Sequence, residues 1–230
     1  DKQLSESFKI GMKGFEEWLR TNSHPVTLFV IADLFMSEEF SRWFAHLLKE
    51  NHERLTVGCH GLNHRSWSAW PEDRDGFSQA LTQATTILQE NTGSAFRPWF
   101  RAPGGYMAPW MASVLAEQGY TVDSSINPSW LVKRKAGKGN SWNEVAQALQ
   151  ESNVLSRPWK TSLSLPINGP ALSLFPLSIL ARWTWKRAPP SITKDEIEQA
   201  VDEPKAEVTT LYWHLLDHAR EKGTWMPPFQ

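Results

Sequence analysis

Two histidines in this 230-residue chain stand four residues apart, directly after an apolar, strand-like run. The run extends from Leu55 to Cys59, and His60 and His64 follow it, with Gly61 between them to permit a tight turn. Proteins with parallel sheets present metal-binding and catalytic side chains at the carboxyl ends of their strands. The pair is therefore a candidate metal site, although two hydrogen-bonded surface histidines would give the same pattern.

Three further functional groups, Arg101, Asp123 and His214, each follow another strand-like run. Two neutral imidazoles and a carboxylate can hold a divalent ion and leave a position open for water. A carboxylate then takes the water proton, an arginine orients that carboxylate, and a separate histidine protonates the leaving group. This set describes metal-assisted hydrolysis of an amide or ester. Asp123 also fits a simpler role, as the cap of its own turn.

The elements that must position these residues alternate along the chain. Apolar residues at helical spacing predict helices over about 5–20, 37–48, 76–91, 109–119, 141–151 and 193–201. Apolar and β-branched runs predict strands at 26–31, 54–59, 120–123, 153–156 and 208–213, and another that ends at Phe100. This alternation predicts an α/β fold with a parallel sheet, closed as a barrel, with one active face.

A proline-rich stretch interrupts the pattern late in the chain. Prolines at positions 166, 170, 176, 189 and 190 argue against long regular elements between residues 161 and 190. We therefore expect an irregular insertion within one domain that spans residues 1–230.

Composition excludes several classes of protein. The net charge of −1 gives no reason to expect nucleic acid or an anionic membrane as a partner. No apolar run is long enough to span a membrane, and no signal peptide opens the chain, so we expect a cytoplasmic protein. A single cysteine, Cys59, excludes an internal disulfide.

Thirteen tryptophans mainly indicate core packing, but Trp67, Trp70, Trp110 and Trp130 stand beside polar turn residues and could line a sugar-binding groove.

Five sequence blocks follow one another along the chain: Thr27–Val30, Val57–His64, Thr92–Gly105, Gly119–Trp130 and Leu211–His214. In this order they resemble the polysaccharide deacetylases, which are carbohydrate esterase family 4 and share the chitooligosaccharide deacetylase homology domain. The resemblance covers about residues 5–135 and returns at 205–218.

The resemblance implies a distorted (β/α)7-type barrel and removal of an acetyl group from an N-acetylated sugar or polysaccharide. It implies that His60, His64 and Asp1 hold a divalent metal, usually Zn²⁺, and that Asp1, Arg101 and His214 are catalytic. The residues that it implies for substrate binding are Tyr106, Asp123, Trp130, Leu211 and Tyr212. The proline-rich segment is most similar to the branch that acts in exopolysaccharide and O-antigen biosynthesis.

The chain departs from the family pattern at its start. The first strand of the family ends in two aspartates, and this chain begins where that strand should end, so we expect the strand to be missing or truncated. Asp1 is either the remaining aspartate or an ordinary terminal residue. Asn127 and Ser129 replace common aspartates, and Asp217 is a substitute partner for His214.

Two alternatives stay open from these departures. One is a catalytically silent carbohydrate-binding barrel that lacks the base aspartate, and the other is a related hydrolase of a non-peptide C–N bond. The sequence does not indicate the oligomeric state.

Overall fold

Five parallel strands form the main sheet of this computed structural model, which describes residues 2–189 and 192–229. Hydrogen bonds join the strands in their sequence order, and a helix connects each strand to the next. Parallel neighbours need such crossovers, because the chain must return to the same end of the sheet. The strands are β1 (Val26–Val30), β2 (Leu55–Cys59), β3 (Phe96–Phe100), β4 (Val122–Asp123) and β5 (Leu155–Ser156).

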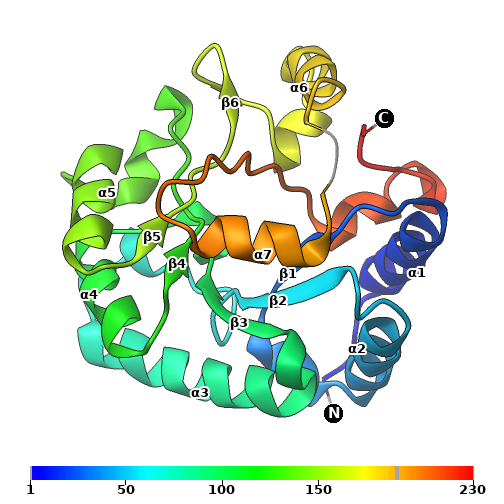
Figure 1. Cartoon of the computed structure of the whole chain (residues 1–230), viewed down its shortest axis with the longest axis horizontal. Helices are drawn as coiled ribbons and strands as arrows, with labels where there is room; N and C mark the ends of the chain where they lie inside the picture. The colour runs from blue at the N-terminus through cyan, green and yellow to red at the C-terminus, as the bar shows by residue number, and fades with distance from the viewer. Residues whose placement is uncertain (1, 190–191, 230) are drawn as a thin grey trace.

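The helices that connect the strands lie around the outer side of the sheet, and the later helix α7 (Lys194–Asp202) crosses its inner side (Figure 1). Side-chain caps fix where several of them begin: the Ser37 hydroxyl accepts from the Phe40 amide, and Ser141 and Thr193 open capping boxes. The helices are α1 (Glu6–Thr21), α2 (Glu38–Glu50), α3 (Arg74–Thr92), α4 (Pro109–Glu117), α5 (Trp142–Glu151), α6 (Leu177–Trp185) and α7 (Lys194–Asp202).

Strand β2 shows how the sheet divides its two faces. Leu55, Val57 and Cys59 are fully buried and belong to the main hydrophobic core. The alternate residues face inwards, where Thr56 contacts α7 and Gly58 leaves room for the ring of Phe29. Strand and helix alternate as the sequence predicts, so the α/β fold of barrel type is confirmed.

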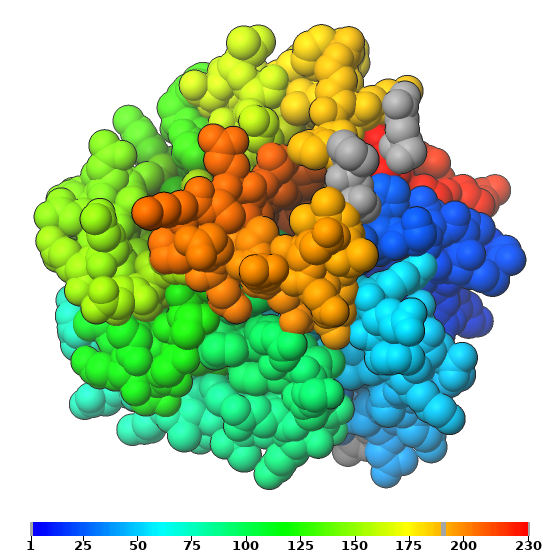
Figure 2. Space-filling model, viewed as in Figure 1, coloured from blue at the N-terminus to red at the C-terminus, as the bar shows by residue number. Residues whose placement is uncertain are grey.

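Helix α7 is anchored to the inner face by polar side chains. Glu198 is 8% exposed and accepts from the Thr56 hydroxyl and from Arg97, both at 2.6 Å. Trp99 donates its indole N–H to Asp202 at 2.9 Å. Figure 2 shows the α7 segment covering the middle of this side of the molecule. The inner side of the sheet is thus closed over β2 and β3 by a helix.

The strand predicted over residues 208–213 is wrong. Only Thr210 pairs as in a sheet, through one parallel bridge to Trp159. The amide of Tyr212 instead bonds to the Asn168 side chain, and its carbonyl accepts from the Gly169 amide. The segment is extended, but the insertion that precedes it supplies its partners in place of a neighbouring strand.

The proline-rich stretch is more regular than expected. It forms a hairpin, β6 (Thr161–Ser162) and β7 (Leu165–Pro166), and the nine-residue helix α6. Pro166 ends β7 and Pro176 immediately precedes α6. The prolines bound these short elements at positions where a missing amide hydrogen is tolerated.

Among the described residues, no helix is both long and apolar enough to cross a membrane.

Replacing Glu198 with alanine tests the anchoring of α7. We expect the free energy of unfolding to fall by about 2–3 kcal/mol, because Thr56 and Arg97 both lose their acceptor in a site with little water. Urea denaturation measures this change. The matched control is Glu203→Ala, which removes an exposed carboxylate that accepts only from the nearby Lys205 amide, and whose effect should stay within about 0.5 kcal/mol. Equal losses in both variants would contradict the anchoring role.

Candidate active site

The two histidines lie on a loop that the neighbouring strand ends hold in place. The His60 amide donates to the Val30 carbonyl at 2.9 Å, which extends the β1–β2 pairing by one residue. Gly61 then turns the chain with a φ of +85°, a conformation that favours glycine. The amides of Ala32 and Asp33 bond to the carbonyls of Gly61 and Leu62. The loop after β1 therefore fastens the histidine loop at the carboxyl edge of the sheet.

A hydrogen bond fixes the tautomer of His60. Its Nδ1 lies 2.7 Å from the Arg101 carbonyl oxygen, which can only accept, so Nδ1 carries the proton and Nε2 keeps its lone pair. Burial lowers the pKa of His60 to about 3, against the opposing effect of the hydrogen bond to the Arg101 carbonyl, and the positive charge of Arg101 acts in the same direction as burial. His60 is therefore neutral, with Nε2 available to a metal ion, as in most metal-binding histidines.

His64 completes a pair of imidazoles suited to a divalent ion. Its ring centroid lies 5.5 Å from that of His60, and its side chain is exposed. Catalytic zinc sites usually have three protein ligands, but residues 2–189 and 192–229 contain no cluster of three His, Cys, Asp or Glu side chains suited to a metal. The two imidazoles are suitable ligands for zinc, and a catalytic zinc site would need one further protein ligand.

The remaining predicted ligand, Asp1, lies outside the described residues. Its neighbour Lys2 is placed: the Lys2 amide donates to the Met36 carbonyl at 3.2 Å, and its ammonium pairs with Asp33 at 2.8 Å. Asp33 belongs to the loop that fastens the histidine loop. The chain at residue 2 therefore lies at the same edge of the sheet as the histidines.

Arg101 follows β3 and is packed between aromatic rings. Its guanidinium carbon lies 4.3 Å from the ring centre of Phe29 and 5.2 Å from that of Tyr212. Nε and Nη2 donate to the carbonyl and hydroxyl of Ser124 at 3.0 and 2.8 Å. Burial lowers the pKa of Arg101 to about 10, so it stays charged at neutral pH. No carboxylate in the described part of the chain forms an ion pair with it.

Trp159 forms a wall of the site that the sequence pattern did not indicate. It is 5% exposed, its indole N–H donates to the Ser124 carbonyl at 2.6 Å, and its ring centre lies 4.4 Å from that of Tyr212. A Cβ on Gly105 would come within 2.7 Å of this ring, so glycine is required there. Trp159 lies shortly after the end of β5. The sequence criterion of functional residues at strand ends would have selected it if aromatic residues had been included.

His214 is held beside this wall by Asp217. The Asp217 carboxylate accepts from the His214 amide at 2.8 Å and lies 3.5 Å from Nδ1 of the same residue, while Arg220 pairs with its other oxygen at 3.0 Å. Burial acts to raise the pKa of Asp217, but the hydrogen bonds and charges of His214 and Arg220 outweigh it and hold the pKa below its usual value. The imidazole of His214 is 53% exposed. It can therefore reach a substrate while a buried carboxylate orients it.

Asp123 acts as a cap in this structure. It is fully buried, and its two oxygens accept from the amide and hydroxyl of Ser125 at 2.9 and 2.6 Å. Burial raises its pKa to about 6 in spite of these bonds and of the charge of Arg101. The Ser125 hydroxyl in turn accepts from the Ala102 amide at 2.8 Å. Asp123 thus braces the chain after Arg101, and its carboxylate is not presented to a substrate.

The other residues expected to bind substrate lie in different surroundings. Tyr212 lies in the site, between Trp159, Arg101 and His214. Tyr106 is partly buried, with the Lys135 ammonium 5.3 Å from its ring centre. Leu211 packs against a small second core around Trp185, and Trp130 is 62% exposed on the 3₁₀ turn Trp130–Ala136.

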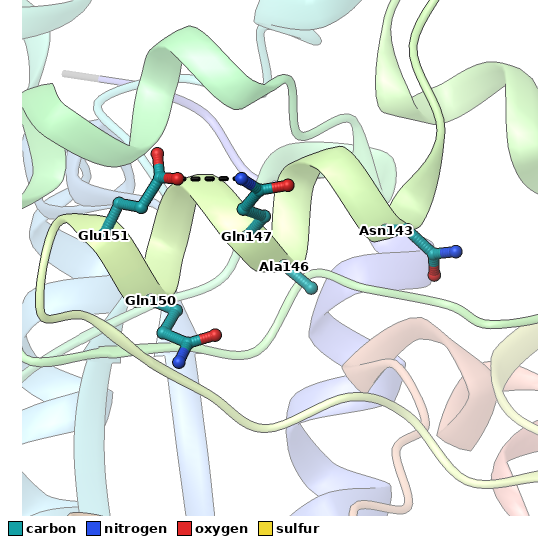
Figure 3. A pocket seen from close by; sticks show the side chains of 5 residues that line it. All are labelled: Asn143, Ala146, Gln147, Gln150 and Glu151. Atoms are coloured by element: carbon teal, nitrogen blue, oxygen red, sulfur yellow. Dashed lines mark hydrogen bonds between the residues drawn. The ribbon is translucent and has the colours of Figure 1, made fainter.

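A hollow on the surface of α5 contains none of the predicted residues (Figure 3). It is lined by side chains of that one helix, with a hydrogen bond of 2.8 Å from Gln147 to Glu151 across one turn. Such a bond is an ordinary feature of an exposed helix face. We assign the hollow no part in the site. Its lining residues are Asn143, Ala146, Gln147, Gln150 and Glu151.

Gly169 is required by the close approach of Tyr212 and His214. Its φ is +52°, and a Cβ there would lie 2.8 Å from the Tyr212 ring and 3.0 Å from the His214 ring. Gly93 has the same φ of +52° but no atom within 4 Å of its Cβ position.

The Gly169→Ala and Gly93→Ala variants therefore separate backbone strain from the clash. Both should lose at least about 1 kcal/mol of stability through the positive φ, and only Gly169→Ala should also meet the rings of Tyr212 and His214. Urea denaturation measures the loss, and NMR of the histidine ring protons should show His214 perturbed only in Gly169→Ala. Indistinguishable variants would show that Gly169 does not position these rings.

His218 supports the turn that carries His214. It is fully buried, its Nε2 accepts the Trp213 indole N–H at 2.9 Å, and its Nδ1 lies 3.2 Å from the Trp225 carbonyl. Burial lowers the pKa of His218 to about 4, although the Trp225 carbonyl and the charge of Asp217 act in the opposite direction. The folded protein thus requires the neutral ring.

Lowering the pH should reduce the free energy of unfolding, because His218 is protonated more readily in the unfolded chain. The unfolded chain takes up a proton near pH 6.5 and the folded chain only near pH 4, so this residue's contribution is complete above pH 6.5 and is lost as the pH falls towards 4. The loss is roughly 3 kcal/mol. It is measured as the slope of unfolding free energy against pH, and His218→Gln should remove that part of the slope. An unchanged slope in the variant would contradict this assignment.

Known proteins resemble this chain both in sequence and in structure. Residues 12–122 match the family described as Polysaccharide deacetylase. A solved chain described as "putative polysaccharide deacetylase from Mycobacterium smegmatis" superposes with a TM-score of 0.51 at 20% sequence identity. The superposition covers 94% of this chain and 66% of that one, so this chain spans slightly less than two thirds of its length. No curated protein matches. The structural likeness establishes the fold, and the family match over residues 12–122 confirms the resemblance seen in the sequence.

Proposed function

We propose that this protein is a metal-dependent hydrolase that removes acetyl groups from an N-acetylated sugar or polysaccharide. The observation that carries the proposal is the hydrogen bond from His60 Nδ1 to the Arg101 carbonyl, 2.7 Å long. It leaves a neutral imidazole with a free Nε2 beside His64, and it ties this pair to the strand end that bears the guanidinium. The match of residues 12–122 to the polysaccharide deacetylases supports the reaction class.

In this proposal His60, His64 and Asp1 hold the divalent ion, most simply Zn²⁺, which imidazole and carboxylate ligands suit. When bound, the ion supplies Lewis acidity, which polarises the acetyl carbonyl and eases deprotonation of water. The position of Lys2 beside the loop of Asp33 supports Asp1 as the third ligand.

Arg101 and His214 have separate tasks in the proposed reaction. The half-buried guanidinium of Arg101 orients the carboxylate that accepts the water proton, a role we assign to Asp1 as well. His214 gives a proton to the leaving amine of the sugar. Asp217 keeps the imidazole of His214 directed by its contact at 3.5 Å. Tyr212 and Trp159 form the aromatic wall against which an acetyl group or sugar ring would pack.

The biological setting is a further part of the proposal. The proline-rich segment motivates a role in exopolysaccharide or O-antigen biosynthesis, and the cytoplasmic location and single-domain organisation expected from the sequence stay predictions.

Metal content tests the proposed site directly. Wild-type protein should copurify with, or take up, about one zinc ion per chain, and His60→Ala and His64→Ala should each weaken zinc binding by at least tenfold, because only two imidazoles are available in the described site. Elemental analysis after dialysis measures this. The control is His52→Ala, since His52 is 75% exposed and should have no effect. Unchanged zinc in the first two variants would end the proposal.

Acetate release from acetylated amino sugars tests the reaction itself. His214→Ala should lower kcat by roughly 10²–10⁴-fold, the usual contribution of a general acid, with zinc content unchanged. Zinc binding without any acetate release by the wild-type chain would favour the silent sugar-binding alternative. Release of acetate from small amides but not from sugars would favour the non-peptide C–N hydrolase.

A further inference from the structure

Helix α6 carries two apolar faces, whereas a surface helix normally needs one. Ala181 and Trp185 are at most 1% exposed and pack into the second core, where the Trp185 indole N–H donates to the Ile167 carbonyl at 2.9 Å. On the other side, Ile179 and Trp183 stand four residues apart and are 64% and 53% exposed, and Phe175, in the turn that precedes the helix, is 76% exposed. The buried face accounts for the stability of α6, so folding does not explain the exposed one.

The adjacent hairpin presents an apolar residue at its tip. Leu163 is 84% exposed, and it and Ser164 form a two-residue turn with φ of +52° and +58°. Turns of this kind favour asparagine and glycine, because both central residues are left-handed. A leucine there disfavours folding and leaves its side chain in solvent. The β6–β7 hairpin contacts α6, and the two stand together at the upper edge of Figure 1.

Basic residues border this apolar surface, and acidic ones are missing from the segment. Arg182, Lys186 and Arg187 are exposed on the last turn of α6 and just beyond it. The guanidinium of Arg187 lies 3.6 Å from the ring centre of Trp183. The sequence has no Asp or Glu between Glu151 and Asp195. The chain's net charge of −1 averages over this strongly basic stretch and hides it.

We propose that this surface docks the protein onto an anionic lipid bilayer. We call it the α6 ridge and define it as Leu163, Phe175, Ile179 and Trp183 with the bordering Arg182, Lys186 and Arg187. An apolar stripe bordered by Lys and Arg, with Trp and Phe in it, is the composition of helices that lie in the membrane interface. Each basic residue near an anionic surface adds to the attraction.

Lipid accounts for the α6 ridge better than a sugar does. Sugar rings stack on flat aromatic faces, but Leu163 and Ile179 are branched aliphatic side chains that gain little from such contacts. The ridge combines a hairpin tip with the exposed face of a helix, and both stand at the upper edge of the molecule in Figure 1. Exposed apolar groups can enter the acyl boundary of a bilayer while the basic side chains remain among the headgroups.

Vesicle sedimentation tests the proposal with the whole chain. Wild-type protein should sediment with vesicles of phosphatidylcholine and phosphatidylglycerol, and much less with phosphatidylcholine alone. Added salt should weaken the binding, because it screens the headgroup charge. Binding to the two vesicle types in equal measure, or to neither, would overturn the proposal.

Two sets of substitutions divide the apolar from the charged contribution. Ile179→Ser with Trp183→Ser should lower the partition coefficient at least tenfold on anionic vesicles. Arg182→Gln, Lys186→Gln and Arg187→Gln together should lower it about a hundredfold, at roughly fivefold for each charge removed, and should abolish the salt dependence. The matched control is Met36→Ser, which removes a side chain that is 67% exposed on a turn that packs against α2 and α3, and it should bind like wild type.

A further variant keeps the test independent of folding defects. Leu163→Asn suits the turn, so its thermal stability should equal or exceed that of wild type while its vesicle binding falls. Unchanged vesicle binding in Leu163→Asn and in the α6 variants would overturn the proposal. So would a wild-type dimer in gel filtration that the α6 variants dissociate and that does not bind vesicles, because the ridge would then contact a second copy of this chain.

Discussion

The hydrogen bond between His60 Nδ1 and the Arg101 carbonyl is the contact on which the rest of the site depends. It can form only because β2 and β3 are neighbours in a register that pairs Cys59 with Phe100 and lets the Arg101 amide bond to the Cys59 carbonyl at 2.9 Å. A slip of one residue would turn both side chains to the opposite face of the sheet. The core under α2 and α3 holds that register, since Leu55, Val57 and Cys59 cannot leave it without exposing apolar surface. Packing on one face of β2 therefore sets the tautomer of an imidazole at its end.

The guanidinium of Arg101 is the second constraint, because a charge removed from water needs compensation. Ser124 supplies two acceptors, and the rings of Phe29 and Tyr212 supply their negative faces. None of these contacts is an ion pair, and the positive charge of Arg101 acts both on the buried Asp123 and on His60. That charge opposes protonation of His60. It also favours any anion that enters the site, which is the condition that orientation of a catalytic carboxylate requires.

Local sequence signals predicted most of the elements, because caps and periodicity act within one segment. Ser37 and Thr193 begin helices and Gly93 ends one as expected, and the strands before His60 and Arg101 end where the site needs them. The run 208–213 has the composition of a strand, but pairing is a property of its neighbours, and the insertion takes up its backbone groups. For the same reason the sequence could indicate that Asp123 ends a strand, but not that Ser125 would occupy both of its oxygens.

The proline-rich insertion contributes both to the candidate site and to the α6 ridge. Its inner residues, Ile167 to Gly169, bond to Tyr212 and to Trp185, and so determine where the segment bearing His214 lies. Its outer residues form the α6 ridge. Both are possible because these elements are short and contacts on one side alone determine where each of them lies. An apolar residue on the other side contributes nothing to that position. The apolar side chains of the ridge are therefore not needed for folding and can contact an external surface. The glycine and asparagine on the inner side, in contrast, are required by the site.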